Sequence, residues 1–206
     1  MKTIKNLLVL FLTLSIFSCS DDDVPAPLQD VESKSYENLY APELGGRGAP
    51  ASGEFVKFDF ITGEVTQSET EWDIAFRATT ILINGGEASG LEDEPARTGL
   101  GGAYIHDEVF ANISEIDPKR IKEDSQLDGL AITKGSGNGW YTYNSQTHII
   151  SPTVNKNLII KTRDGKYAKV KILNYYKDRE DTDYTKSGYY AFEYVYQPNE
   201  GVTTFE

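Results

Sequence analysis

Apolar and polar side chains alternate with a period of two along most of the chain after residue 54. Val56, Phe58 and Phe60 fall on one face of a segment whose intervening residues are charged. Such alternation is typical of a half-buried β-strand. The same reasoning predicts strands over residues 72–77, 79–84, 158–163, 166–173 and 189–196.

Local chemistry marks one hairpin and one short helix. An Asp-Gly pair at 164–165 separates two of the predicted strands, and it favours a type I′ turn, whose twist matches paired strands. Asp117 before Pro118 is a helix-start signal, but the apolar spacing beyond it supports only a short helix. The predicted fold class is therefore mostly β: antiparallel hairpins forming a compact domain, with little helix and two long ligand-binding loops over 85–102 and 135–152.

The N-terminus has the features of an exported lipoprotein. Residues 1–18 combine two lysines with an apolar run too short to span a bilayer, which is typical of a cleaved secretory signal. Cys19, the only cysteine, follows at once, where a bacterial lipoprotein carries its acyl chains. We expect residues 19–52 to form an acidic flexible tether with at most one helical turn, at 36–40, and residues 53–206 to form the domain.

Charge and composition narrow the possible partners. The net charge is −12, and loss of Lys2 and Lys5 with the signal leaves −14. A surface this acidic repels phosphate backbones and anionic headgroups, so we expect no nucleic acid partner and membrane contact only through the lipid anchor. A single cysteine excludes disulfides and cysteine-based metal sites within the chain. The only methionine, Met1, leaves with the signal, so two histidines are the remaining soft or imidazole ligands.

Catalytic patterns are absent from the sequence, which has no phosphate-binding glycine loop, no His-Glu-x-x-His and no Gly-x-Ser-x-Gly. Asp73 and Arg77 share one face of their predicted strand, as a structural ion pair, and Trp72 begins the opposite, apolar face. Three carboxylates at 92–94 are typical of a solvated loop tip. We expect a binding protein, with Asp73 and Glu92 as the acid/base candidates of the enzyme alternative.

The two histidines are the candidate metal ligands. His106 follows the longest glycine-rich loop, and His148 lies in the other long loop among aromatic residues. Two imidazoles could occupy the axial positions of a haem iron from opposite sides while aromatic loops bury the macrocycle. Without Cys-x-x-Cys-His such a haem, of the b type, would be noncovalent. Each ligand must be neutral, so acidification should weaken binding.

Short blocks in a fixed order carry a family resemblance: 71–77 (EWDIAFR), 83–86 (INGG), 101–104 (GGAY), 139–144 (GWYTYN), 163–170 (RDGKYAKV) and 174–176 (NYY). They resemble HmuY-type haem-binding lipoproteins over residues 55–196, and the lipoprotein start fits that family. The resemblance implies an almost entirely β domain that grips one haem between finger-like and thumb-like loops. It also implies a haemophore at the cell surface, anchored in the outer membrane.

The resemblance implies further partners and site residues. Such a protein takes haem from the surroundings, host haem proteins included, and passes it to a TonB-dependent outer-membrane haem receptor for iron acquisition. His106 and His148 are the candidates for two-ligand coordination, and Tyr104, Tyr141 and Tyr143 are the candidates to pack on the ring or bind its propionates. The sequence does not choose a propionate partner among Arg47, Arg97, Lys134 and Lys156. The alternative is a β-rich surface module that binds glycan, peptide or protein through its 13 tyrosines and 2 tryptophans.

Overall fold

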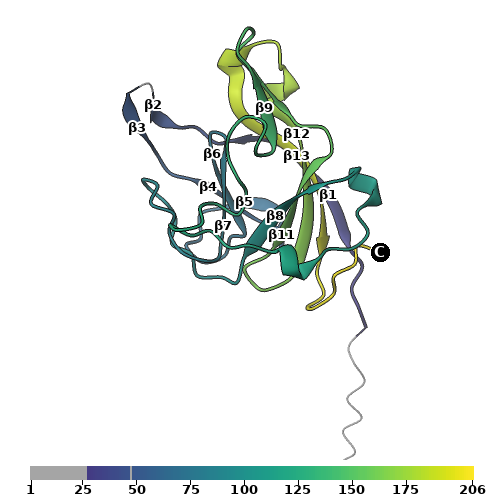
Figure 1. Ribbon diagram of the computed structural model, residues 1–206. Helices are drawn as coiled ribbons and strands as arrows, with labels where there is room; N and C mark the ends of the chain where they lie inside the picture. The colour runs from purple at the N-terminus through teal and green to yellow at the C-terminus, as the bar shows by residue number, and fades with distance from the viewer. Residues whose placement is uncertain (1–26, 47) are drawn as a thin grey trace, which may run out of the picture.

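The computed structural model describes residues 27–46 and 48–206. The predicted signal segment, Cys19 and Arg47 lie outside the described residues. Within those ranges the chain is mostly β, as predicted (Figure 1), and its helices are short 3-10 turns: η1 (Phe110–Asn112), η2 (Pro118–Arg120), η3 (Lys177–Arg179) and η4 (Tyr184–Lys186). No helix of residues 27–46 or 48–206 is long and apolar enough to cross a membrane.

Two antiparallel sheets and two small hairpins make up the domain. The five-stranded sheet has the order β1 (Glu32–Tyr40), β13 (Ser187–Gln197), β12 (Tyr167–Tyr176), β11 (Lys156–Lys161) and β8 (Gly102–Asp107). The four-stranded sheet has the order β5 (Glu64–Thr66), β4 (Val56–Asp59), β6 (Ile74–Arg77) and β7 (Thr80–Ile83). The hairpins pair β2 (Leu44–Gly46) with β3 (Ala49–Ser52), and β9 (Tyr141–Asn144) with β10 (Ile149–Pro152).

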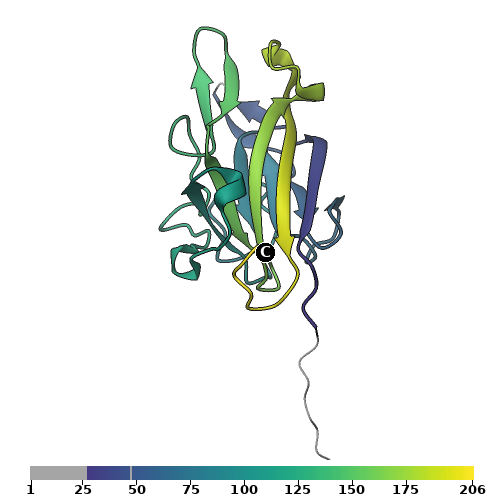
Figure 2. The ribbon, with the colours of Figure 1, turned by 90° about the vertical axis from the view of Figure 1, so that its right-hand side faces the viewer.

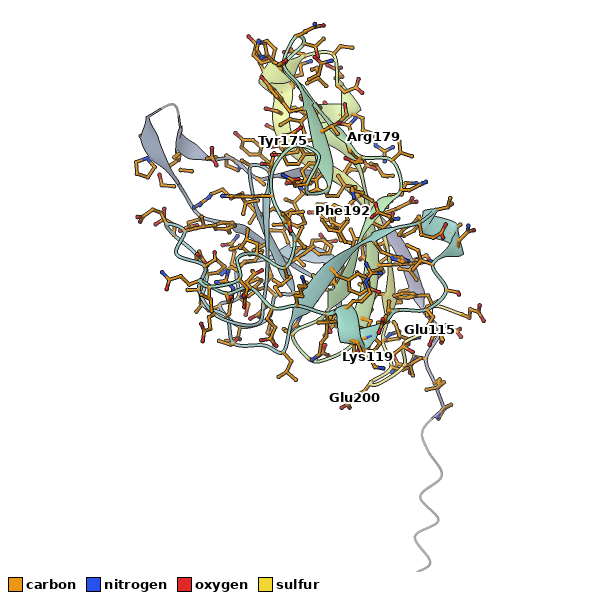
Figure 3. The ribbon with its side chains drawn as sticks, viewed as in Figure 1. Glu115, Lys119, Tyr175, Arg179, Phe192 and Glu200 are labelled. Atoms are coloured by element: carbon orange, nitrogen blue, oxygen red, sulfur yellow. The ribbon has the colours of Figure 1, made fainter. Side chains whose placement is uncertain are left out.

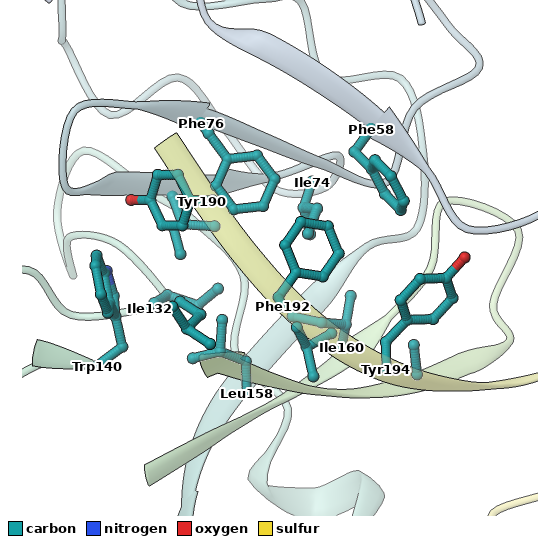
Figure 4. Close-up of a cluster of buried hydrophobic side chains, with 14 of the residues drawn as sticks. Phe58, Ile74, Phe76, Ile132, Trp140, Leu158, Ile160, Tyr190, Phe192 and Tyr194 are labelled. Carbon is teal, nitrogen blue, oxygen red and sulfur yellow. The ribbon is translucent and has the colours of Figure 1, made fainter. Parts of the chain in front are cut away.

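The main core lies between the two sheets. The predicted inward face of the last strand is confirmed, because Tyr190, Phe192, Tyr194 and Tyr196 all belong to one buried cluster. Phe192 meets Phe58 of the other sheet with ring centroids 5.2 Å apart in an edge-to-face arrangement (Figure 4). Such aromatic pairs contribute about 0.5–1.5 kcal/mol beyond their area burial, so this cluster fixes how the sheets face each other.

The predicted Asp-Gly hairpin is confirmed, but its turn is not of the predicted type I′. That turn needs a positive φ at both Asp164 and Gly165, and of the two only Gly165 has one. Gly165 has φ +84°, and the strands that it joins pair Leu158 with Val170. Ala168, Val170 and Ile172 belong to the main core, whereas Tyr167 lies in a second cluster on the opposite face of the sheet. Sequence alternation therefore assigned both faces of β12 correctly.

Residues 32–40 differ from the predicted tether. They form β1, which pairs along β13 at an edge of the five-stranded sheet, rather than a helical turn (Figure 2). Leu39 is buried in the main core, and Tyr36 stacks on Phe192 at 5.9 Å. The strand is polar and exposed along much of its length, so its sequence lacks the apolar alternation that marks a central strand.

Two smaller predictions need correction, and a third is confirmed. Trp72 precedes β6 and packs in a third cluster with Phe55 and Leu82, away from Ile74 in the main core. The short helix predicted after Asp117 forms as η2, and the Asp117 side chain accepts a hydrogen bond from Lys119 N at 3.0 Å. The second predicted long loop contains the β9–β10 hairpin, because its residues pair with each other once the chain turns back.

A buried ionic network joins the sheets at the end of the domain formed by the β11–β12 turn. We call this region the ionic end. Arg163 Nη1 lies 2.8 Å from Asp59 Oδ1 and 3.1 Å from Asp73 Oδ2. Asp73 also accepts hydrogen bonds from the backbone N of Phe60 and of Arg163. Burial raises the pKa of Asp73 to about 6, against the opposing effect of these donors.

Candidate functional site

The end of β12 opposite the ionic end carries the β9–β10 hairpin and the β12–β13 connector, residues 177–186. We call these two segments the aromatic end. Figures 1 and 2 show the hairpin beside the connector, and Figure 3 places Arg179 and Tyr175 in this region, away from Lys119 and Glu115. The hairpin is attached to β12, because Ile150 N donates to Tyr176 Oη at 2.7 Å.

The hairpin turn is built by its own polar groups. Asn144 Oδ1 accepts hydrogen bonds from Gln146 N and Thr147 N, which folds residues 145–148 back onto the strand. Asn144 pairs with Ile149, so His148 is the last residue of a four-residue turn. His148 is exposed and has φ +61°, in the left-handed region.

The rings of Tyr143 and Tyr184 lie beside His148. Its Nδ1 lies 2.6 Å from Tyr143 Oη, and Tyr143 is 44% exposed. The Tyr184 ring, from η4 in the connector, packs edge-on against the imidazole with centroids 5.7 Å apart, and Tyr184 is 55% exposed. A flat aromatic ligand could therefore reach both the imidazole and two tyrosine rings from solvent.

Tyr184 was not predicted from the sequence. Its contact with His148 joins two segments that are distant in the chain, and no local pattern encodes such a meeting. The connector is in turn fixed to β1, because Asn38 and Asp178 exchange two hydrogen bonds and Arg179 pairs with Glu37. The predicted tether thus contributes to the support of the site.

His106 has different surroundings. It lies on strand β8, not in a loop, half-buried on the face opposite the main core. Its Nδ1 lies 2.9 Å from Arg120 Nη1, and its ring meets Tyr104 at 6.0 Å. A cavity of about 400 Å³ adjoins it, lined also by Glu115, Asp117 and Pro118. His106 and His148 are thus placed on separate elements with separate neighbours.

The predicted tyrosines fall into three different settings. Tyr143 contacts His148, as described above. Tyr104 is 6% exposed, accepts a hydrogen bond from Asp117 N and carries the Arg120 guanidinium 4.2 Å from its ring centroid. Tyr141 is half-buried against Trp140, with its hydroxyl 3.3 Å from Thr79 Oγ1. Of the three, only Tyr143 lies at an exposed imidazole.

Two of the basic residues considered for propionates are already paired. Arg97 is buried between Glu94 and Asp124, where it supports the loop that follows β7. Lys156 lies 2.8 Å from Asp107. Arg97 therefore serves the fold.

The acid/base candidate Asp73 is buried in the ionic network. The predicted ion pair between Asp73 and Arg77 is wrong. Arg77 instead donates to the backbone carbonyls of Gly53 and Glu92 and stacks 4.1 Å from the Phe55 ring centroid. Asp73 is fully buried, and Arg163 takes the place expected for Arg77. A carboxylate in this position supports the fold and is not accessible to a substrate.

A larger cavity of about 890 Å³ lies elsewhere, bounded by residues 86–87 and by the segment 121–133. Its volume is in the range of small-molecule sites, but its lining includes Glu87, Glu123 and Asp128 and no histidine. Carboxylates repel an anionic ligand. Among residues 27–46 and 48–206, no group of three or more His, Cys, Asp or Glu is arranged to hold a metal ion.

Fold and site together define a class: a two-sheet antiparallel β domain with an exposed, histidine-bearing aromatic end. The model of the HmuY protein family matches residues 52–194, which is more than half of the chain. The chain therefore belongs to the HmuY family, as its sequence blocks indicated.

Solved structures that are similar to this chain come from three bacteria. The apo HmuY analogue of Tannerella forsythia superposes with a TM-score of 0.54 at 14% identity, covering 84% of this chain and 100% of that one. A provisionally named HmuY-like haem-binding protein of Bacteroides vulgatus ATCC 8482 gives 0.47 at 15% identity, covering 82% and 93%. A provisionally named lipoprotein of Bacteroides fragilis NCTC 9343 gives 0.46 at 12%, covering 82% and 90%. No curated protein matches the chain.

Proposed function

We propose that this protein is a haem-binding lipoprotein of the cell surface that captures haem and delivers it to an outer-membrane receptor. Membership of the HmuY family over residues 52–194 is the observation that carries the proposal. Cys19 would bear the lipid anchor, with membrane affinity supplied by acyl chains rather than by the acidic domain. The protein acts as a carrier of noncovalent haem b and not as a catalyst.

The aromatic end supports the proposal chemically. Haem is held by a side-chain ligand to its iron and by flat apolar surface against its ring. His148 supplies an exposed imidazole, and the rings of Tyr143 and Tyr184 supply aromatic surface beside it. An open site of this kind suits a carrier, because the ligand must leave again for the receptor.

The two histidines differ in readiness to bind iron. Arginine only donates hydrogen bonds, so Arg120 occupies the Nδ1 lone pair of His106 and leaves the proton of the neutral ring on Nε2. Ligation through either ring nitrogen of the neutral His106 would require loss of that contact. A tyrosine hydroxyl both donates and accepts, so His148 has no such obstacle. We therefore propose His148, in preference to His106, as a ligand of the haem iron.

Titration of the purified protein with haemin tests the proposal. We expect a sharp Soret band that His148→Ala abolishes or shifts. Loss of the band in His106→Ala as well would support the two-histidine ligation predicted from the sequence, and an unchanged band would leave His148 as the sole imidazole ligand. A wild-type protein that gives no Soret band would refute haem binding.

Exposed tyrosines favour a second candidate, a surface module for glycan or protein. Tyr40 is 49% exposed and stacks on Tyr189 with centroids 4.3 Å apart, near the same end of β13. Such rings suit sugar or protein recognition equally well. Retention on an oligosaccharide column by a protein that binds no haem would support this alternative.

A further inference from the structure

His148 occupies a left-handed backbone conformation, which is uncommon for residues other than glycine. Its φ of +61° lies in the left-handed region, and it is the last residue of the turn between β9 and β10. Glycine adopts this conformation without steric cost, whereas a side chain brings Cβ close to the carbonyl. The turn therefore holds an imidazole at a position where glycine would serve the backbone better, and residues held in this way cluster at functional sites.

The imidazole at this position is fixed by one short contact. Tyr143 Oη lies 2.6 Å from Nδ1, which is a short hydrogen bond. Tyr143 is itself placed by the hairpin, since its backbone N donates to Ser136 Oγ at 2.8 Å and it pairs with Ile150. The Tyr143 ring is not buried, so this geometry does not result from core packing.

The chemistry of this contact has two forms. If the hydroxyl donates to Nδ1, the proton of the neutral imidazole lies on Nε2, and a metal there requires that the proton leave. If Nδ1–H donates to the hydroxyl oxygen, Nε2 has a free lone pair, and an iron–nitrogen bond forms without loss of a proton. Metal-bound histidines commonly use the second arrangement, in which the other ring nitrogen donates to an oxygen.

We infer that Tyr143 is a positioning residue, whose hydroxyl oxygen accepts a hydrogen bond from Nδ1–H of His148 and so directs Nε2 toward the iron of haem. The inference rests on the proposed function. It gives Tyr143 a role through His148, distinct from the packing or propionate contact expected from the sequence. It also explains why a tyrosine is exposed beside a histidine in a strained turn.

Haemin titration of four variants tests the inference. Tyr143→Phe keeps the ring and removes the hydroxyl, and we expect its haem affinity to fall about 10- to 100-fold, the usual effect of losing such a partner. We also expect the iron–histidine stretching band of the ferrous protein to shift in resonance Raman spectra. Tyr36→Phe removes a tyrosine hydroxyl on β1, away from His148, and should match the wild type.

The second pair of variants separates positioning from direct contact with haem. In His148→Gly, added imidazole should restore the Soret band, because a free ligand can enter the space and choose its own orientation. Adding Tyr143→Phe to that variant should then change the affinity little, since its effect requires the histidine. An equal loss in both backgrounds, or no loss in Tyr143→Phe alone, would overturn the inference.

The remaining outcomes distinguish the inference from the proposals on which it rests. Haem binding that survives both His148→Gly and Tyr143→Phe without spectral change would overturn the inference together with the assignment of His148, while haem binding stands. The absence of a Soret band from the wild type would overturn both the proposed function and the inference. Circular dichroism of each variant confirms that the β fold is intact.

Discussion

The two ends of β12 are stabilised in opposite ways. At the ionic end, Arg163, Asp59 and Asp73 are largely buried and bonded to each other and to the backbone of both sheets. At the aromatic end, the Glu37–Arg179 pair and the Tyr143–His148 contact are exposed. Buried charge resists separation because an unpaired ion left behind is costly, whereas exposed contacts exchange with water at little cost.

Backbone strain follows the same division. Of the seven non-glycine residues with positive φ in the described ranges, four lie at the aromatic end or on the β1 bulge bonded to it: Asn38, His148, Asp178 and Arg179. The domain therefore has one end where buried charges join its sheets and another where strained residues and exposed side chains meet solvent. An exposed end suits the proposed role of a carrier, which must take up and release its ligand.

Of the predicted changes, breaking the ionic network should lower the free energy of unfolding the most. In Arg163→Met the carboxylates of Asp59 and Asp73 lose their partner while the side-chain volume is largely kept. Removing one partner of a buried pair costs about 3–5 kcal/mol, so we expect a comparable loss in the free energy of unfolding. Urea denaturation measures it. A change below 1 kcal/mol would show that the network contributes no more than a surface pair.

The pH dependence of stability should sharpen the view of the same network. Burial raises the pKa of Asp73 from 3.8 to about 6, so between these values the folded state holds a proton that the unfolded state has lost. The contribution of Asp73 to the free energy of unfolding is fully present below pH 3.8 and is lost as the pH rises through about 6. Its slope is at most about 1.4 kcal/mol for each pH unit.

Asp73→Asn should remove that slope. We expect the difference in unfolding free energy between wild type and variant to change between pH 4 and 6 and to stay constant above pH 7. A constant offset at every pH would mean that Asp73 has the same pKa in both states. The other carboxylates titrate in both proteins, so their contributions cancel in the difference between the two free energies of unfolding.

The sequence predicts the sheets and their core better than it predicts the contacts around the candidate site. Strands such as β12 and β13 alternate because one face packs in the core, and that periodicity is local. The fold class and the Asp-Gly hairpin could therefore be predicted. Strand β1 could not, because it is a polar edge strand whose partner, β13, lies at the other end of the chain.

The site depends on contacts that no local pattern encodes. The scarcity of histidine singled out His148, but Tyr184 comes from a distant connector, and the Nδ1 partners of His106 and His148 depend on the geometry of the whole fold. The sequence alone does not distinguish the two histidines as candidate ligands. Arg120 beside one and Tyr143 beside the other make them chemically different.

The exposed pair at the aromatic end should tolerate change. Arg179→Ala removes the contact with Glu37, and both side chains are about half exposed, at 48% and 47%. Exposed pairs contribute about 0.2–1 kcal/mol, and salt screens them. We expect a loss in this range by urea denaturation that shrinks at 1 M salt. A loss as large as that of Arg163→Met would contradict the division between the two ends.

An effect similar in size to that of Arg179→Ala concerns the backbone of His148 in the protein without haem. His148→Ala and His148→Gly both remove the imidazole, but only glycine relieves the left-handed strain. Because a non-glycine residue in this conformation costs about 1–2 kcal/mol and glycine loses up to about 1 kcal/mol more in chain entropy on folding, we expect His148→Gly to be the more stable by roughly 0.5–1 kcal/mol. Thermal unfolding of both variants measures the difference. If alanine were equally stable, the turn would not be strained, and the presence of a histidine there would need no functional reason.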